Sequence, residues 1–227
     1  MIGIITYDAP HRKTQDLIFH LLMKGYRDIH LLVLPWVKRK NFQPLYIHRP
    51  SVRLEINIDT LCKRLDISFS RLSVHELSNH LDRHPLEAIL IGGSGILPAK
   101  VVKNNKIINA HPGYLPYAKG LDALKWSIYH NYPLGATTHF ISEDTDQGVL
   151  IDQIEIPILK TDSFHSIARR VYEMEIQLLA ESIEIIDTNK ALLTSLRDDQ
   201  PAFKRMPNST ELEMMKRLQI RLDKKVD

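Results

Sequence analysis

The sequence has one cysteine, no long apolar run and little net charge, and each shortage excludes a class of protein. Cys62 cannot form an internal disulfide. No apolar stretch approaches the roughly 20 residues that cross a bilayer, so we expect no membrane partner. The formal net charge of +3 is too small to indicate nucleic-acid binding. The N-terminus enters an apolar run without a basic region or cleavage site, so we expect a cytoplasmic protein.

The composition is that of an ordinary globular protein, with 227 residues, 44% of them hydrophobic and 25% charged. We expect one main domain over residues 1–188. Beyond that the chain becomes more polar, and Pro201 and Pro207 interrupt it. Residues 189–227 are therefore predicted to form a small helical C-terminal extension.

Apolar runs alternate with helical patterns through the first half of the chain. The runs predict strands at residues 2–7, 29–34, 67–72, 88–91 and 106–109, and helices are expected after residue 10 and near 57–65 and 75–83. Continuous apolar strands separated by helices indicate a Rossmann-like α/β fold with a mostly parallel sheet. Ligands of such sheets bind beyond the carboxyl ends of the strands.

The pattern changes in the second half. Residues 136–141 and 149–156 are strand-like and flank a polar turn, which predicts an antiparallel hairpin at one edge of the sheet. Asp162 or Ser163 is expected to cap a long helix that follows.

Asn109 and His111 stand where a buried strand ends, within Asn109-Ala110-His111-Pro112-Gly113. Two residues apart on a strand, their side chains point to the same side. A carboxamide can donate to an oxyanion and an imidazole titrates near neutral pH, so the pair could serve acyl transfer. A structural histidine is an equally common explanation of such a pattern.

Two further patterns have competing explanations. The acidic turn Ser142-Glu143-Asp144-Thr145-Asp146 is, taken alone, more typical of a solvated hairpin. The Gly92-Gly93-Ser94-Gly95 loop could suggest a dinucleotide site, whose pattern is Gly-x-Gly-x-x-Gly. Here Gly93-x-Gly95-x-x-Pro98 has proline in place of the third glycine, where a helix should open. The sequence contains no His-Glu-x-x-His zinc pattern, and we expect no metal.

Taken together, several separated motifs resemble the folate-dependent formyltransferases. They are Asn109-x-His111-Pro112, Leu115-Pro116, Gly120-Leu121, Gly135-Ala136-Thr137-x-His139 and Asp146-Gln147-Gly148. The resemblance covers roughly residues 88 to 160. It implies the formyltransferase fold, with residues 1–188 as the catalytic domain and N10-formyltetrahydrofolate as the formyl donor. By the same resemblance, Asn109 would polarise the formyl oxygen, His111 would handle the proton of the attacking amine, and Asp146 would orient the imidazole.

The resemblance also implies where the donor binds, and clustered charge suggests some of the contacts to the acceptor. The pterin of the folate would lie against the loop after the fourth strand and the turn bearing the aspartate, namely Ile91, Gly92, Gly93, Ser94, Gly95, Ile96, Leu97 and Asp144. Candidate contacts to the acceptor are Lys38, Arg39, His48, Arg49, Tyr114, Tyr117, Lys119 and Gly120. The cations among them suit a phosphate group.

The acceptor is expected to be a nucleotide-linked deoxy amino sugar used in surface polysaccharide or glycan synthesis. The first strand is followed by Tyr7-Asp8-Ala9-Pro10, not by the Gly-Ser-Gly phosphate loop of the ribonucleotide transformylases. Lys119-Gly120-Leu121-Asp122 and Lys204-Arg205-Met206-Pro207 resemble segments of the sugar N-formyltransferases. Alternatives are a formyltetrahydrofolate hydrolase, a glycinamide ribonucleotide-type transformylase and a non-catalytic binding protein on the same fold. We expect a homodimer.

Overall fold

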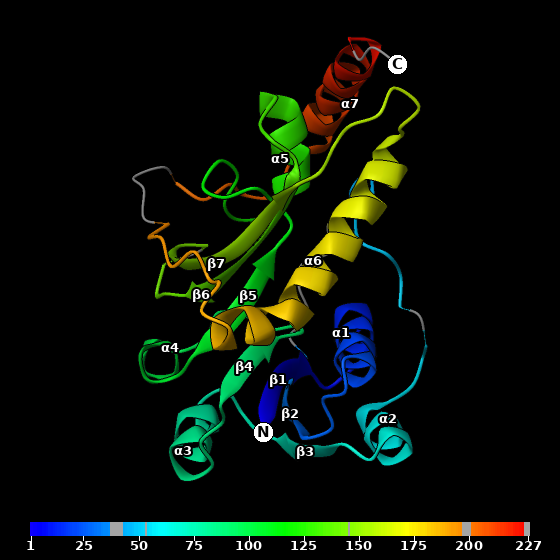
Figure 1. Ribbon diagram of the computed structural model, residues 1–227. Helices are drawn as coiled ribbons and strands as arrows, with labels where there is room; N and C mark the ends of the chain where they lie inside the picture. Colours follow the sequence, from blue (N-terminus) through cyan, green and yellow to red (C-terminus); the bar gives the residue numbers. More distant parts are fainter. Residues whose placement is uncertain (37–42, 53, 145, 197–200, 225–227) are drawn as a thin grey trace. The chain divides into compact units, whose positions relative to one another are not determined.

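The computed structural model describes residues 1–36, 43–52, 54–144, 146–196 and 201–224 (Figure 1). The chain forms two compact units. Unit 1 comprises Met1–Lys40 and Ser51–Asn109, and unit 2 comprises Asn41–Pro50 and Ala110–Asp227. The C-terminal extension thus falls within unit 2, and the boundary predicted near residue 188 stays a prediction.

The strands follow the order β3-β2-β1-β4-β5-β6-β7. Their bounds are β1 (Ile2–Tyr7), β2 (Ile29–Leu34), β3 (Ser68–Arg71), β4 (Ala88–Ile91), β5 (Ile107–His111), β6 (Gly135–Ile141) and β7 (Gly148–Glu155). The pairs β1–β2, β1–β4, β2–β3 and β4–β5 are parallel, and β6–β7 is antiparallel. The predicted α/β fold with a mostly parallel sheet and an antiparallel edge hairpin is confirmed.

Unit 1 contains four helices among its described residues. They are α1 (Arg12–Met23), α2 (Ile58–Leu65), α3 (Glu76–Arg83) and α4 (Ala99–Asn104). The Asn57 side chain accepts a hydrogen bond from the Thr60 backbone N–H and so caps α2. The sequence did not predict α4, because six residues are too few to display a helical period.

The described part of unit 2 contains the helices α5 (Ala123–His130), α6 (Phe164–Asp187) and α7 (Asn208–Asp223). The predicted cap of the long helix α6 is Ser163, which exchanges hydrogen bonds with Ser166 in a capping box. The helix α7 confirms the predicted helical tail. Figure 1 shows α7 beside α5, and the two helices are in contact.

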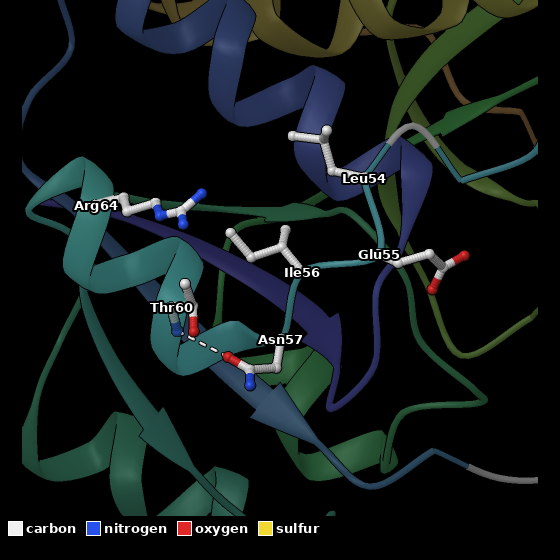
Figure 2. A pocket seen from close by; sticks show the side chains of 6 residues that line it. All are labelled: Leu54, Glu55, Ile56, Asn57, Thr60 and Arg64. Carbon is white, nitrogen blue, oxygen red and sulfur yellow. Dashed lines mark hydrogen bonds between the residues drawn. The ribbon is translucent and has the colours of Figure 1, made fainter.

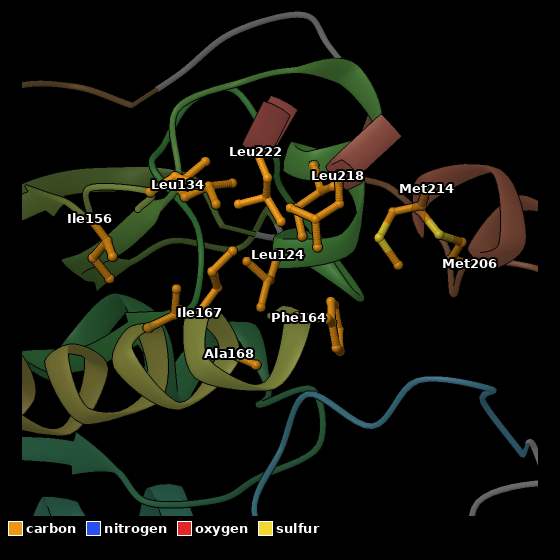
Figure 3. Packing of buried hydrophobic residues seen from close by; sticks show 13 residues of the cluster. Leu124, Leu134, Ile156, Phe164, Ile167, Ala168, Met206, Met214, Leu218 and Leu222 are labelled. Atoms are coloured by element: carbon orange, nitrogen blue, oxygen red, sulfur yellow. The ribbon is translucent and has the colours of Figure 1, made fainter. Parts of the chain in front are cut away.

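A hydrophobic cluster joins the three helices of unit 2 (Figure 3). Met214, Leu218 and Leu222 lie four residues apart on α7, which places them on one face of the helix. They pack with Leu124 from α5 and residues of α6. Burial of this apolar face anchors the C-terminal helix within unit 2.

No helix among the described residues is both long enough and apolar enough to cross a membrane.

Candidate active site

The strand β5 carries both residues of the predicted Asn109-x-His111 pair. The His111 side chain is buried, with 3% of the residue exposed, and Asn109 is half-buried. Because side chains alternate along a strand, residues 109 and 111 belong to the same face of β5. Asn109 is the last residue of unit 1, whereas His111 belongs to unit 2.

Both ring nitrogens of His111 have partners within unit 2. Nδ1 lies 3.3 Å from Oδ2 of Asp146, and Nε2 lies 2.6 Å from the backbone oxygen of Ala118. A carboxylate and a carbonyl oxygen can only accept hydrogen bonds. When both contacts are made, the imidazole therefore carries a hydrogen on each nitrogen and is positively charged.

The electrostatics of the pair agree with that charge state. Burial alone would lower the pKa of His111, but the Asp146 carboxylate and the Ala118 carbonyl outweigh it and raise the pKa. Burial would raise the pKa of Asp146, but the charge and hydrogen bond of His111 and the Gly120 N–H lower it to about 2. Both shifts favour an imidazolium held against a carboxylate.

Asp146 reaches His111 from the turn between β6 and β7. Its backbone is left-handed, with a φ of 51°, a conformation that aspartate tolerates better than most residues. Oδ2 also accepts the backbone N–H of Gly120 at 2.6 Å. The acidic turn of the sequence is therefore more than a solvated hairpin, because one of its carboxylates faces a buried histidine.

A second buried histidine faces the same carboxylate. Nε2 of His139, on β6, lies 4.0 Å from Oδ1 of Asp146, and His139 is 1% exposed. Burial is the main cause that lowers the pKa of His139 to about 4, so this ring is neutral at physiological pH. The sequence contained a signal for it, because His139 belongs to the Gly135-Ala136-Thr137-x-His139 motif, but it was not among the predicted site residues.

The loop of residues 112–122, called the 112–122 loop below, connects β5 to α5. Thr137 anchors its first part, because the hydroxyl donates to the Gly113 oxygen and accepts from the Leu115 N–H. Of the predicted acceptor contacts, Tyr114 is half-buried and Tyr117 is 50% exposed, with their rings 6.3 Å apart. Lys119 is only 2% exposed.

The predicted pterin loop, residues 91–97, follows β4 in unit 1. A Cβ on Gly93 would lie 2.8 Å from the rings of Tyr7 and His11, so only glycine lets the loop pack this closely. The Tyr7 hydroxyl donates to the Ser94 oxygen, and Ile96 is 94% exposed. Gly93 thus has a packing role in unit 1, and folate binding by this loop remains a prediction.

The remaining predicted site residues are distributed as follows. Asp144 is exposed in the turn between β6 and β7. Lys38 and Arg39 lie outside the described residues.

His48 and Arg49 belong to the short segment of unit 2 that comes early in the chain; its described residues, 43–50, are called the 43–50 loop below. Arg49 forms a two-point ion pair with Glu175 of α6, whose side chain is fully buried. Burial, followed by the charge of Arg49, lowers the pKa of His48 to about 3, so this ring is neutral at physiological pH. Phosphate binding by His48 would therefore be through a hydrogen bond and not a positive charge.

A pocket in unit 1 contains none of the predicted site residues (Figure 2). Leu54 and Ile56 supply apolar walls, and Glu55 and Arg64 supply opposite charges. Asn57 also lines it, but its Oδ1 is bound to the Thr60 N–H. The pocket has no cluster of groups that specifies a reaction.

The His111–Asp146 pair can hold and move a proton in a buried setting, and Asn109 on the same strand adds a neutral donor. Within the described part of the chain, no cluster of three His, Cys, Asp or Glu side chains is placed to hold a metal ion. Among the described residues, a seven-stranded, mostly parallel sheet with an Asn-x-His strand end and an aspartate turn fits the resemblance to the folate-dependent formyltransferases.

The family comparison agrees with this description. The formyl transferase family model matches residues 55–183, more than half of the chain. The chain therefore belongs to the formyl transferase family, whose members are enzymes.

Curated relatives include two kinds of formyltransferase. The chain is 33% identical over 89 residues to a dTDP-4-amino-4,6-dideoxyglucose formyltransferase of Mycobacterium bovis, which covers 39% of this chain and 38% of that protein. It is also 33% identical over 93 residues to a phosphoribosylglycinamide formyltransferase of Haemophilus influenzae, and the match covers 40% of this chain and 44% of that protein. The aligned part is thus less than half the length of either relative.

Solved structures share the fold over most of the chain. The structure of a 4-N formyltransferase from Francisella tularensis has a TM-score of 0.64 at 19% identity, covering 95% of this chain and 86% of that one. Phosphoribosylglycinamide formyltransferase from Anaplasma phagocytophilum has a TM-score of 0.62 at 21% identity, covering 83% and 87%. At these identities the likeness concerns the fold.

Proposed function

We propose that this protein transfers a formyl group from N10-formyltetrahydrofolate to the primary amine of a nucleotide-linked deoxy amino sugar. The observation that carries the proposal is the buried His111–Asp146 pair at the end of β5. The sugar acceptor is supported by the absence of a Gly-Ser-Gly phosphate loop after β1 and by the similarity to the M. bovis amino-sugar formyltransferase.

In the proposed reaction the neutral amine attacks the formyl carbon. The Asn109 carboxamide donates a hydrogen bond to the formyl oxygen as that oxygen gains negative charge. His111 reacts from its neutral form, in which Nδ1 keeps its hydrogen toward Asp146 and Nε2 accepts the proton that the amine loses. The bond from the formyl carbon to N10 then breaks, and the proton passes to N10, so atoms and charge balance.

This scheme requires one change in the site. Nε2 of His111 contacts the Ala118 carbonyl, and a nitrogen that donates there cannot accept a proton. Loss of that hydrogen and separation from Ala118 convert the imidazolium into the base. Asp146 would then stabilise the charge that returns to the ring when the amine proton arrives.

The test is formyl transfer to a panel of nucleotide-linked 3-amino and 4-amino deoxysugars, with glycinamide ribonucleotide as a comparison acceptor and mass detection of products. We expect one sugar to gain a formyl group. His111→Ala and Asp146→Asn should each lower turnover by about 100-fold or more. The matched variant His165→Ala changes an exposed histidine of α6 and should retain turnover.

Other outcomes would change the assignment. Formylation of glycinamide ribonucleotide alone would contradict the sugar acceptor. Formate release without any acceptor would indicate a hydrolase, and folate binding without turnover would indicate a binding protein. The homodimer and the cytoplasmic location expected from the sequence are part of the proposal and are checked by sedimentation and cell fractionation.

A further inference from the structure

The backbone of the 112–122 loop contacts both members of the His111–Asp146 pair. The Ala118 carbonyl contacts Nε2 of His111, and the Gly120 N–H donates to Asp146. These two backbone groups are only two residues apart. The orientation of the imidazole and of the carboxylate therefore depends on the position of one short stretch of backbone.

That stretch is paired on its other side with Phe203, in the segment that leads to α7. The Phe203 N–H donates to the Lys119 oxygen at 2.8 Å, and the Leu121 N–H donates to the Phe203 oxygen at 2.9 Å. The two bonds form a parallel bridge between Gly120 and Phe203. In such a bridge the N–H of the central residue points away from the partner, which for Gly120 is toward Asp146.

Gly120 is required for this close approach. Its φ of 90° is left-handed, and a Cβ there would lie 2.3 Å from the Phe203 oxygen. The contact between the 112–122 loop and residue 203 is therefore tighter than any other residue type would permit.

Side chains hold the segment around Phe203 in place. The Phe203 ring stacks on Trp126 of α5 at 4.8 Å, and Nε1 of Trp126 donates to the Lys204 oxygen. The Met206 N–H donates to Asp122, at the end of the 112–122 loop, and the Met206 side chain is fully buried in the hydrophobic cluster. The segment is thus fixed by a ring stack, hydrogen bonds and an apolar anchor.

We propose that Phe203 is a positioning residue, which holds the backbone of residues 118–120 against His111 and Asp146 from outside the predicted catalytic motifs. The inference rests on the proposed function, because it takes those two residues as the catalytic pair. It assigns the C-terminal segment a part in catalysis that its own sequence, which carries no catalytic group at residue 203, does not suggest.

The test compares Phe203→Ala with Phe203→Tyr, which keeps the stacked ring, in the full-length protein. Phe19→Ala is the control, because Phe19 is an exposed aromatic residue of α1 in unit 1. The first measurement is the NMR titration of the His111 ring in the absence of substrate. The groups that act on this ring are Asp146 from the β6–β7 turn, the Ala118 carbonyl, Glu175 from α6 and His139 from β6.

Loss of the Ala118 contact in Phe203→Ala should lower the titration midpoint of His111, because that carbonyl favours the charged ring. We expect kcat to fall about tenfold with KM changed less than about twofold, since loss of the Gly120 N–H misaligns Asp146, which orients the reacting ring, while binding is retained. Phe203→Tyr and Phe19→Ala should keep the wild-type midpoint. A folded Phe203→Ala with unchanged midpoint and kcat would overturn the proposal.

If Phe203→Ala does not fold, Phe203→Leu is assessed by the same two measurements and the same criteria. The titration needs no acceptor, which separates this proposal from the function. A lowered midpoint in a protein that formylates no amine would support the positioning role and contradict the proposed function. Formyl transfer to a sugar, together with an unchanged midpoint and kcat in the folded Phe203 variant, would support the proposed function and contradict the positioning role.

Discussion

Two loops of unit 2 are held in place by different kinds of bond. The 112–122 loop is held mainly through its own backbone, which bonds to Phe203, Asp146 and the Thr137 hydroxyl. The 43–50 loop is held by buried carboxylates: Glu211 of α7 accepts the N–H groups of Leu45 and Tyr46, and Glu175 of α6 binds Arg49.

The difference determines which substitutions each loop tolerates. A backbone hydrogen bond survives most changes of side chain. The 112–122 loop is therefore sensitive mainly at Gly120, whose backbone conformation needs glycine, and at its partners Thr137 and Phe203. A buried carboxylate is costly unless it is paired, so the 43–50 loop depends on charges that must all be present. The loop beside the proposed catalytic pair is thus the one less dependent on buried ion pairs.

The largest effect is expected at Glu211. Its side chain is fully buried and binds the fully buried Lys125 as well as the 43–50 loop. Glu211→Gln leaves the Lys125 charge without its counter-charge and should lower the free energy of unfolding by about 3 to 5 kcal/mol. The measurement is urea unfolding.

The control for this change is Glu213→Gln on the same helix. The Glu213 side chain is 45% exposed, and its ion pairs with Lys216 and Arg217 lie on the surface. Glu213→Gln should lower the free energy of unfolding by no more than about 1 kcal/mol. Equal losses in the two variants would remove the distinction between buried and exposed carboxylates on which the comparison depends.

The next effect is the pH dependence of the His111–Asp146 pair. The pKa of Asp146 is lowered to about 2, so its stabilisation of about 2 kcal/mol is present above its unfolded pKa of 3.8 and is lost as the pH falls through 2. The pKa of His111 is raised, so its stabilisation is present below 6.5 and is lost as the pH rises through the folded value.

Both contributions are therefore complete between about pH 4 and pH 6.5. The difference in free energy of unfolding between the wild type and Asp146→Asn should be largest in this window and smaller at about pH 2 and about pH 9. Urea unfolding at the three pH values measures it. A difference that is independent of pH would show that the pair is not ionised as described.

The 43–50 loop should respond to acid in the opposite way. The folded pKa of His48 is about 3, so the unfolded chain binds more protons than the folded one as the pH falls below 6.5. Protonation of His48 in the unfolded chain therefore lowers the free energy of unfolding below pH 6.5, whereas the contribution of the His111–Asp146 pair is complete between about pH 4 and pH 6.5. Acid therefore acts on the two loops through different histidines.

The smallest effect is expected at Thr137, the side-chain anchor of the 112–122 loop. Thr137→Val keeps the shape but leaves the Leu115 N–H and the Gly113 oxygen without this partner, at a cost of about 1 to 2 kcal/mol. Thermal unfolding gives the comparison with Thr188→Val, an exposed position that should change stability by less than about 0.5 kcal/mol. Similar shifts in melting temperature would argue against an anchoring role.

The sequence predicted those features that leave a local pattern. Apolar runs located β1, β2 and β4, and an apolar period located the long helix α6. His111 and Asp146 were found because motifs with a family resemblance contain them, and the structure brings their side chains within 3.3 Å. Their roles in the reaction remain predictions.

Contacts between distant residues left weaker signals. Leu45 and Glu211 are 166 positions apart, and nothing near either residue indicates the other. Glu175 did leave a trace, because it falls among the buried apolar residues of α6, where a carboxylate needs a cationic partner. The sequence could not show that this partner is Arg49, which the charge pattern had suggested for phosphate binding.

The contact between Glu211 and the 43–50 loop also concerns the order in which the protein is made. Residues 45 and 46 leave the ribosome long before residue 211, and until then their N–H groups lack this acceptor. The Lys119 oxygen and the Leu121 N–H likewise lack their hydrogen-bond partner until Phe203 has been made. A nascent chain therefore completes both loops only after residue 211 has been made, and a ribosome that stalls before residue 203 leaves the proposed catalytic pair without this support.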